Sequence, residues 1–106
     1  MKLGVVISSS DIETVWNAFR LANFSRQEGD DVKVFLVAKG VDYEGKSTPQ
    51  FPAQNEAEKF VSGGGVILAC GTCLTLRNNP GDALCPMSSM KELYWMVKES
   101  EKIVCF

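Results

Sequence analysis

Hydrophobic and polar residues follow one another in blocks along this chain, and the blocks predict strands and helices in turn. Short runs of apolar and β-branched residues are typical of strands buried on both faces of a sheet. Stretches in which apolar residues recur every three or four positions are typical of helices that cover a sheet. The strands expected on this basis are residues 3–8, 32–38, 66–69 and 103–106, with 83–85 as a further, very short one.

The helical pattern appears between these runs. A first helix is expected to start at a capping box of Ser10 and Glu13 and to end at Gly29. A second helix runs from about Pro52 to the three glycines 63–65, and a short third helix reaches about Arg77. A last helix is expected behind a second capping box, Ser89 with Glu92. Its predicted apolar face consists of Met90, Leu93, Tyr94 and Val97.

Strands that alternate with helices imply βαβ units, and therefore a parallel sheet with helices on both faces. The predicted fold class is α/β, a three-layer α/β/α sandwich with a mainly parallel sheet of four to five strands. The 106 residues are expected to form a single domain, 1–106. In such sheets the carboxyl ends of the strands collect the active groups, so residues 8–11, 38–43 and 70–73 should share one edge.

Composition excludes several classes of partner. The chain has 11 basic and 13 acidic residues, for a net charge of −2, and no basic cluster, so a nucleic-acid partner is not expected. The apolar run at the start is too short for a secretory signal, and no run approaches the length of a membrane span. Four cysteines are too few for a secreted disulfide scaffold. The expectation is a cytoplasmic protein with reduced thiols and no membrane contact.

The segment Cys70-Gly71-Thr72-Cys73 follows the third strand directly, and it is the strongest chemical signal in the chain. Since the chain has no histidine, nucleophilic or redox chemistry has to depend on cysteine. At a strand-to-helix turn the positive end of the helix favours a thiolate. Cys70 is the candidate nucleophile, and Cys73 is a candidate second thiol that forms a disulfide with Cys70 or accepts sulfur from it. The alternative is that both are small buried residues.

Three further residues are candidates for binding a substrate. Arg77 lies four residues after Cys73 and on a continued helix would share its face. There it is a candidate to hold an anionic sulfur donor or a thiolate. The alternative is an ordinary surface arginine. Ser8 and Ser9 follow the first strand and are candidates for anion binding at a helix start. Their surroundings lack the glycines of a phosphate-binding loop, so helix capping is the better interpretation.

The two remaining cysteines have separate interpretations. Cys85 precedes Pro86 near the start of the last helix, where it is a candidate for the substrate site or for a metal site with the two thiols of the CxxC segment. A closed zinc site needs four ligands and no histidine supplies the fourth, so neither a metal nor another cofactor is expected. Cys105 is expected to face the core from the terminal strand.

The aromatic residues suggest core and contact surfaces rather than a cofactor site. Trp16, Phe19 and Phe24 fit a core face or a subunit contact. Trp95 and Met96 lie off the predicted apolar face of the last helix. If they are exposed, they suggest an interface of a homo-oligomer, because large apolar patches are seldom left in water.

These features together resemble the DsrE/DsrF-like family, which includes the TusD-type sulfur-relay proteins. The resemblance spans nearly the whole chain. It is most specific in the CxxC segment with the arginine at position 77 and in the Ser-Met-x-x-Leu start of the last helix, residues 89–93. The arginine is followed here by Asn-Asn-Pro-Gly, whereas relay members usually continue into a glycine-containing turn.

The resemblance implies a small α/β/α fold, assembly into oligomers and, in some members, a cysteine that carries persulfide sulfur between proteins. By its position that cysteine matches Cys70, and Cys73 matches a second cysteine that only some relatives have. The leading hypothesis is therefore a sulfur carrier, or persulfide sulfurtransferase, with sulfur-donor and sulfur-acceptor proteins as partners. The alternatives are a thiol–disulfide redox protein using Cys70 and Cys73, and a non-catalytic oligomeric binding module.

Overall fold

The computed structural model describes residues 1–106 and contains one five-stranded sheet in which all strands are parallel. The order across the sheet is β4-β3-β2-β1-β5. The strands are β1 (Lys2–Ile7), β2 (Asp31–Leu36), β3 (Val66–Cys70), β4 (Met87–Ser88) and β5 (Lys102–Cys105). The predicted α/β fold class with a parallel sheet is confirmed.

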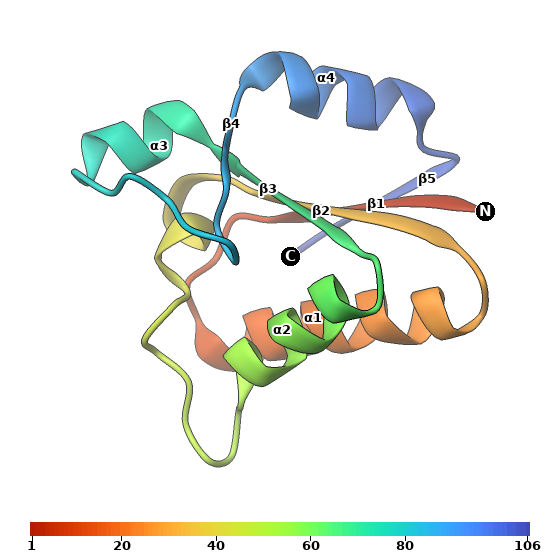
Figure 1. Cartoon of the computed structure of the whole chain (residues 1–106), viewed down its shortest axis with the longest axis horizontal. Helices are drawn as coiled ribbons and strands as arrows, with labels where there is room; N and C mark the ends of the chain where they lie inside the picture. The colour runs from red at the N-terminus through yellow and green to blue at the C-terminus, as the bar shows by residue number, and fades with distance from the viewer.

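Helices cover both faces of the sheet and make the predicted three layers (Figure 1). Helices α1 (Ile12–Gln27) and α2 (Ala53–Ser62) lie on one face, and α3 (Gly71–Leu76) and α4 (Met90–Glu99) lie on the other. A 3₁₀ helix, η1 (Ala38–Asp42), follows β2 in a region expected to be a loop. None of these helices combines the length and apolar character that a membrane crossing requires.

The strands alternate their side chains between two cores of unequal size. On the side of α1 and α2, 19 buried residues form the main core, to which β1 contributes Leu3, Val5 and Ile7. On the opposite side only Phe35, Cys70 and Met96 form a buried cluster. Since alternate strand residues face opposite sides, Cys70 points away from the main core, into the thinner layer of α3 and α4.

The N-cap of helix α1 lies one residue after Ser10, the residue at which the predicted capping box began. Asp11 is the N-cap, and its carboxylate accepts the Thr14 N–H at 3.0 Å and the Thr14 hydroxyl at 2.8 Å. Ser9 supports this turn, because its hydroxyl accepts the Asp11 N–H at 3.0 Å. The capping box of Ser10 and Glu13 was therefore wrong: a charged carboxylate one residue further along makes the stronger cap.

The predicted apolar face of α4 was right only at Leu93, which is half-buried and packs against the small cluster. The one buried residue of this helix is Met96, which packs with Phe35, whereas Met90, Tyr94 and Val97 are exposed. Ser89 precedes the helix but makes no capping hydrogen bond from its side chain. The physical reason is that α4 touches the sheet along a narrow line. Gly4 allows this approach, since a Cβ there would lie 3.2 Å from Met96 Cε.

The strand expected at 83–85 is a tight turn instead. Asp82 and Cys85 exchange backbone hydrogen bonds of 3.1 and 3.2 Å in an isolated antiparallel bridge. The strand that extends the sheet is β4, whose Met87 pairs with Ala69 of β3. The prediction failed because a reciprocal bond across four residues bends the chain before it can join the sheet.

Cys105 is exposed, although it was expected to face the core. It lies on the outermost strand, on the same face as Ile103, and the side chains of α4 reach only Ile103. Of the aromatic residues, Phe19 is fully buried, Trp16 is half-buried against Phe51, and Phe24 is exposed.

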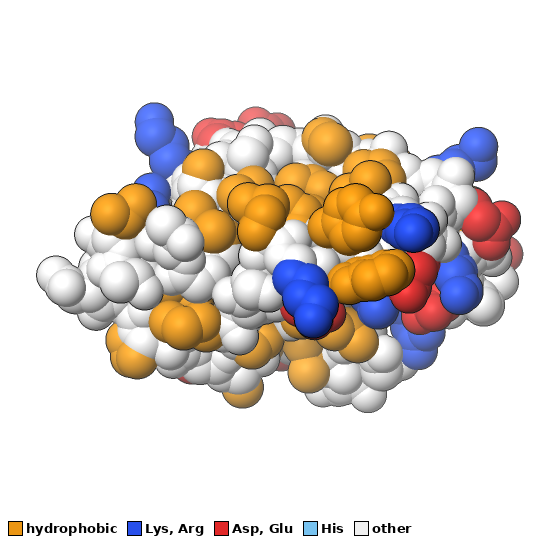
Figure 2. Space-filling view, turned by 90° about the horizontal axis from the view of Figure 1, so that it is seen from above, with side chains coloured by type: hydrophobic (Ala, Val, Ile, Leu, Met, Phe, Trp, Pro, Cys, Tyr) orange, Lys and Arg blue, Asp and Glu red, His pale blue; other side chains and the backbone are white.

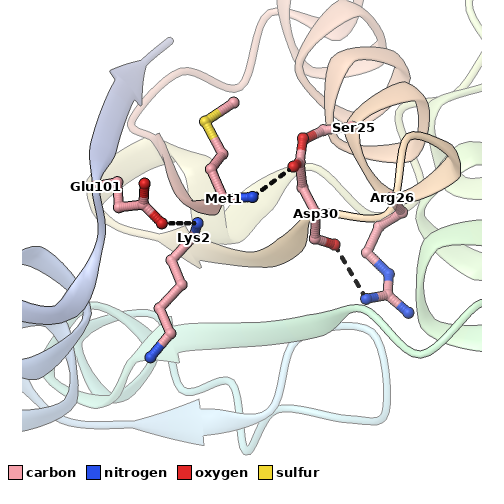
Figure 3. A network of polar contacts seen from close by, with 6 residues as sticks. All are labelled: Met1, Lys2, Ser25, Arg26, Asp30 and Glu101. Atoms are coloured by element: carbon pink, nitrogen blue, oxygen red, sulfur yellow. Dashed lines mark hydrogen bonds and ion pairs between the residues drawn. The ribbon is translucent and has the colours of Figure 1, made fainter.

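A polar network holds the amino ends of the strands together, at the edge opposite the CxxC segment (Figure 3). The Met1 ammonium lies 2.7 Å from the Asp30 carboxylate, which also accepts the Ser25 hydroxyl at 2.7 Å. Next to it, the Lys2 N–H donates to the Glu101 carboxylate at 3.0 Å. These contacts connect the segments that lead into β1, β2 and β5.

Candidate thiol site

Cys70 is both the last residue of β3 and the N-cap of α3. Its backbone is extended, with φ −60° and ψ 115°, and its Sγ accepts the Cys73 N–H at 3.4 Å. The side chain is 5% exposed. The thiol therefore lies at the N-terminus of α3, where a thiolate accepts hydrogen bonds that an ordinary surface cysteine lacks.

Cys73 connects the site to the neighbouring strand. Its Sγ accepts the N–H of Ala38 at 3.2 Å, and Ala38 begins η1 directly after the end of β2. Ala38 has a φ of 54°, a left-handed conformation that is strained for a residue with a Cβ. The predicted meeting of residues 38–43 and 70–73 at one edge is thus observed, and the contact between them is a sulfur hydrogen bond.

Arg77 joins α3 to η1 from the other end. Its Nε lies 2.8 Å from the Asp42 carboxylate, and its Nη1 donates to the Cys73 carbonyl at 3.1 Å. The guanidinium is therefore already held by two protein acceptors. Its charge lowers the pKa of both thiols, and its two contacts connect α3 to η1.

The two thiols line an open pocket of about 370 Å³. Its other walls come from Val37 directly after β2, from Ser88 at the end of β4, from Ser89, and from Met90 at the start of α4. Helix α3 and strand β4 approach each other closely at Gly71, where a Cβ would lie 2.6 Å from the Ser88 carbonyl oxygen. The glycine between the cysteines is thus required for α3 to pack against β4.

The pKa values of the two thiols are displaced in opposite directions. Burial raises the pKa of Cys70, but hydrogen bonds from the Cys73 thiol and from the backbone N–H groups of Cys73 and Thr72, together with the Arg77 charge, outweigh it and lower the pKa. The pKa of Cys73 is raised because its thiol donates to Cys70 and is partly buried. The first proton to leave this pair is therefore the proton of Cys70.

Replacing Arg77 by methionine is expected to raise the pKa of Cys70, because the guanidinium charge favours the thiolate. At a pH below that pKa less thiolate is present, so alkylation of Cys70 slows and its pH profile moves to higher pH. Rates with iodoacetamide, followed by mass spectrometry between pH 5 and 10, measure this shift. The matched control is Asp42→Asn, which removes the partner of Arg77 and keeps the charge; an equal shift in both variants contradicts the electrostatic explanation.

Ser8 and Ser9 lie at the carboxyl edge but do not line this pocket. Ser8 donates its hydroxyl to the Phe106 carbonyl at 3.1 Å, and Ser9 accepts from Asp11. Ser9 thus supports the helix start, as the capping interpretation expected, whereas Ser8 connects the end of β1 to the C-terminal residue.

Cys85 does not join the other thiols. It is fully buried in the main core, with its Sγ 3.7 Å from the Val41 carbonyl oxygen. Burial, and then the charges of Glu44, Asp82 and Asp42, raise its pKa to about 12. The structure contains no group of three or more His, Cys, Asp or Glu side chains placed to hold a metal ion. The three-thiolate site considered for Cys85 is therefore not formed.

The sequence missed the pocket residues that come from other elements. Val37, Ser88 and Met90 line the pocket, and Ala38 donates to Cys73. The rule that parallel strands collect groups at their carboxyl ends pointed to the segment after β2. Nothing in the local sequence marks Ser88, because its strand is only two residues long.

Comparisons with known proteins give relatives without assigned functions. No family model matches the sequence. The uncharacterised protein MK0008 of Methanopyrus kandleri is 30% identical over 96% of this chain and 91% of its own length. The uncharacterised protein MJ0989 of Methanocaldococcus jannaschii is 29% identical over the full length of both. Among solved structures, the YchN protein of E. coli superimposes with a TM-score of 0.83 and 20% identity over all of both chains, which establishes a shared fold.

Proposed function

Because the chain belongs to the family of the uncharacterised M. kandleri protein MK0008 and has the DsrE-like fold of YchN, we propose that it is a sulfur carrier. In this proposal Cys70 transiently holds persulfide sulfur at the end of β3. The observation that carries the proposal is the Cys70 thiol in its pocket, with hydrogen-bond donors directed at its sulfur and a lowered pKa. The thiolate, rather than the neutral thiol, is the form that attacks sulfur.

The proposed loading step takes place at the pocket that Cys70 lines. The Cys70 thiolate attacks the outer sulfur of a donor persulfide, R–S–SH. A new S–S bond forms at Cys70 while the S–S bond of the donor breaks, and the donor leaves as a thiolate. The sulfane sulfur changes its carrier and there is no net oxidation. A volume of about 370 Å³ admits the added sulfur together with the end of the donor, since a water-sized group occupies roughly 30 Å³.

The test uses the Cys73→Ser variant, in which no second thiol at the site accepts or displaces sulfur. The protein is incubated without oxygen with one equivalent of cysteine persulfide, and its peptides are then mapped by mass spectrometry. We expect one added sulfur atom, about 32 Da, on the peptide that contains Cys70. The absence of this adduct, under conditions that load a known carrier protein, would overturn the proposal.

Sulfur-donor and sulfur-acceptor proteins are the proposed partners, and the face around the pocket favours them. Figure 2 shows apolar side chains gathered on the face of α3 and α4, with basic and acidic side chains beside them. The exposed apolar residues there are Leu76, Met87, Met90, Tyr94, Trp95 and Val97. Lys98 lies 5.2 Å from the centre of the Trp95 ring, and neither it nor Lys91 forms an ion pair in the structure. Glu92 and Glu99 are exposed on the same helix, so the charges balance and a largely apolar partner surface fits this face.

We also propose that the chain forms a homo-oligomer, because Trp95 is 41% exposed, as an interface residue would be before assembly. Sedimentation equilibrium of the purified chain tests the proposal, and a monomer at all concentrations would contradict it.

A cytoplasmic location is proposed on the basis of the four free cysteines and is tested by cell fractionation.

A second candidate is thiol–disulfide exchange by Cys70 and Cys73. The observation that favours it is the opposite displacement of the two thiol pKa values, as in dithiols with one attacking and one resolving cysteine. The reduction potential of the pair decides this candidate. A value far outside the range of physiological thiol pairs, about −270 to −120 mV, would exclude it.

A further inference from the structure

The second thiol of the site has a position that sulfur carriage alone does not use. Cys73 is half-buried in the wall of the same pocket as Cys70, one helical turn away, and its own N–H donates to the Cys70 sulfur. Its Sγ is held by the Ala38 N–H at 3.2 Å. A thiol that is held beside the carrier sulfur is placed to react with whatever the carrier sulfur binds.

We propose that Cys73 discharges the sulfur held on Cys70 as hydrogen sulfide, so that the chain reduces persulfides and polysulfides. This inference rests on the proposed function, because it begins from the Cys70 persulfide. It adds a reaction product, sulfide, and a substrate class, small molecules with sulfane sulfur.

The reaction balances in atoms and electrons. The Cys73 sulfur attacks the inner sulfur of the persulfide, which is Sγ of Cys70, and a Cys70–Cys73 disulfide forms. The bond between the inner and outer sulfurs breaks, and the outer sulfur leaves with its own hydrogen and the proton of the Cys73 thiol as H₂S. The outer sulfur is reduced by two electrons, and each cysteine sulfur is oxidised by one. A dithiol reductant, small or protein-bound, then restores the two thiols.

Two features of the site favour this direction of attack. The Cys-x-x-Cys spacing at the start of a helix permits a disulfide between its ends. The Ala38 N–H directed at Cys73 Sγ stabilises a thiolate there as the proton leaves.

The other cysteines are not placed to take this role. Cys85 is fully buried on the opposite side of the sheet, and its thiol donates a hydrogen bond to the Val41 carbonyl. Cys105 is exposed at the end of the edge strand β5 and does not line the pocket. Discharge within one chain therefore depends on Cys73 alone.

The experiment compares the wild-type chain with Cys73→Ser and Cys73→Ala, and uses Cys105→Ser as the matched control. Each reduced protein receives one equivalent of cysteine persulfide without oxygen, and sulfide is measured above a protein-free control. For the wild type and Cys105→Ser we expect about one sulfide per chain and a peptide of residues 70–73 about 2 Da lighter than the dithiol. For both Cys73 variants we expect at least a tenfold loss of sulfide release and a retained adduct of about 32 Da on Cys70.

The possible results separate the two proposals. If the Cys73 variants carry the adduct and the wild type carries the same adduct without releasing sulfide, this inference is overturned and the carrier function stands. If the Cys73 variants release sulfide as fast as the wild type, the inference is also overturned. If no protein accepts sulfur on Cys70, the carrier function itself has failed and the inference fails with it. The alanine variant keeps the test valid if serine disturbs the pocket.

Discussion

Replacing Cys70 by serine is expected to abolish both the sulfur adduct and the release of sulfide. Cys70 is the one thiol at this edge whose pKa is lowered and whose sulfur receives N–H donors from α3. A serine hydroxyl has nearly the same shape but is not ionised near neutral pH, so it has no comparable nucleophile. Both readouts should fall to the level of a protein-free control, while circular dichroism and the unfolding midpoint change little.

Cys105→Ser is the control, because it removes the exposed thiol and leaves the pocket intact. It should accept sulfur as the wild type does. Loss of uptake in Cys105→Ser together with full uptake in Cys70→Ser would place the reactive thiol on β5 and contradict the proposed site. Resistance of Cys70 and Cys73 to alkylation in the native protein, while the exposed Cys105 reacts, would instead favour a non-catalytic binding module.

The largest effect on stability is expected from Phe35→Ala. Phe35 is fully buried at the centre of the small cluster that also contains Cys70 and Met96, and it is the main aromatic contact between α4 and the sheet. Truncating a buried phenylalanine to alanine destabilises proteins by about 3–5 kcal/mol. Since domains of this kind have a total unfolding free energy of about 5–15 kcal/mol, the change removes a large part of it. Urea denaturation at pH 7 measures the difference.

Phe24→Ala is the matched control, since the same substitution is made at a side chain that is 61% exposed on α1. Its unfolding free energy should change by no more than about 0.5 kcal/mol. Equal losses in the two variants would show that the layer of α4 does not contribute a core. Phe35→Ala should also reduce sulfur uptake at temperatures where part of the protein is unfolded, because Cys70 packs in the same cluster.

The order of strands and helices, the parallel sheet and the place of the CxxC segment were all predictable from the sequence. They depend on patterns that repeat over a few residues, such as the apolar run before Cys70 and the three-to-four spacing through α1. The carboxyl-edge rule then brought residues 38–43 next to the thiols. Local spacing predicts these features because backbone geometry imposes the same periods in every helix and strand.

The sequence was a poor guide wherever a side chain had two plausible environments. Met96 and Val97 are neighbours of similar character, and only the line along which α4 touches the sheet buries the first and exposes the second. Cys105 has the alternation of a core residue but lies on an edge strand beyond the reach of α4. Exposure depends on which elements pack together, and periodicity contains no information about that.

The sequence alone thus determined that two thiols stand at the carboxyl end of a buried parallel strand in a chain without histidine. Only the tertiary structure decided their different roles. It directs the Ala38 N–H at Cys73 and pairs Arg77 with Asp42, contacts between residues 35 positions apart in the chain. It also places Cys85 in the other core. Such contacts depend on how whole elements pack. The lowered pKa of Cys70, by contrast, comes mainly from hydrogen bonds within the CxxC turn, donated by the Cys73 thiol and by the backbone N–H groups of Cys73 and Thr72.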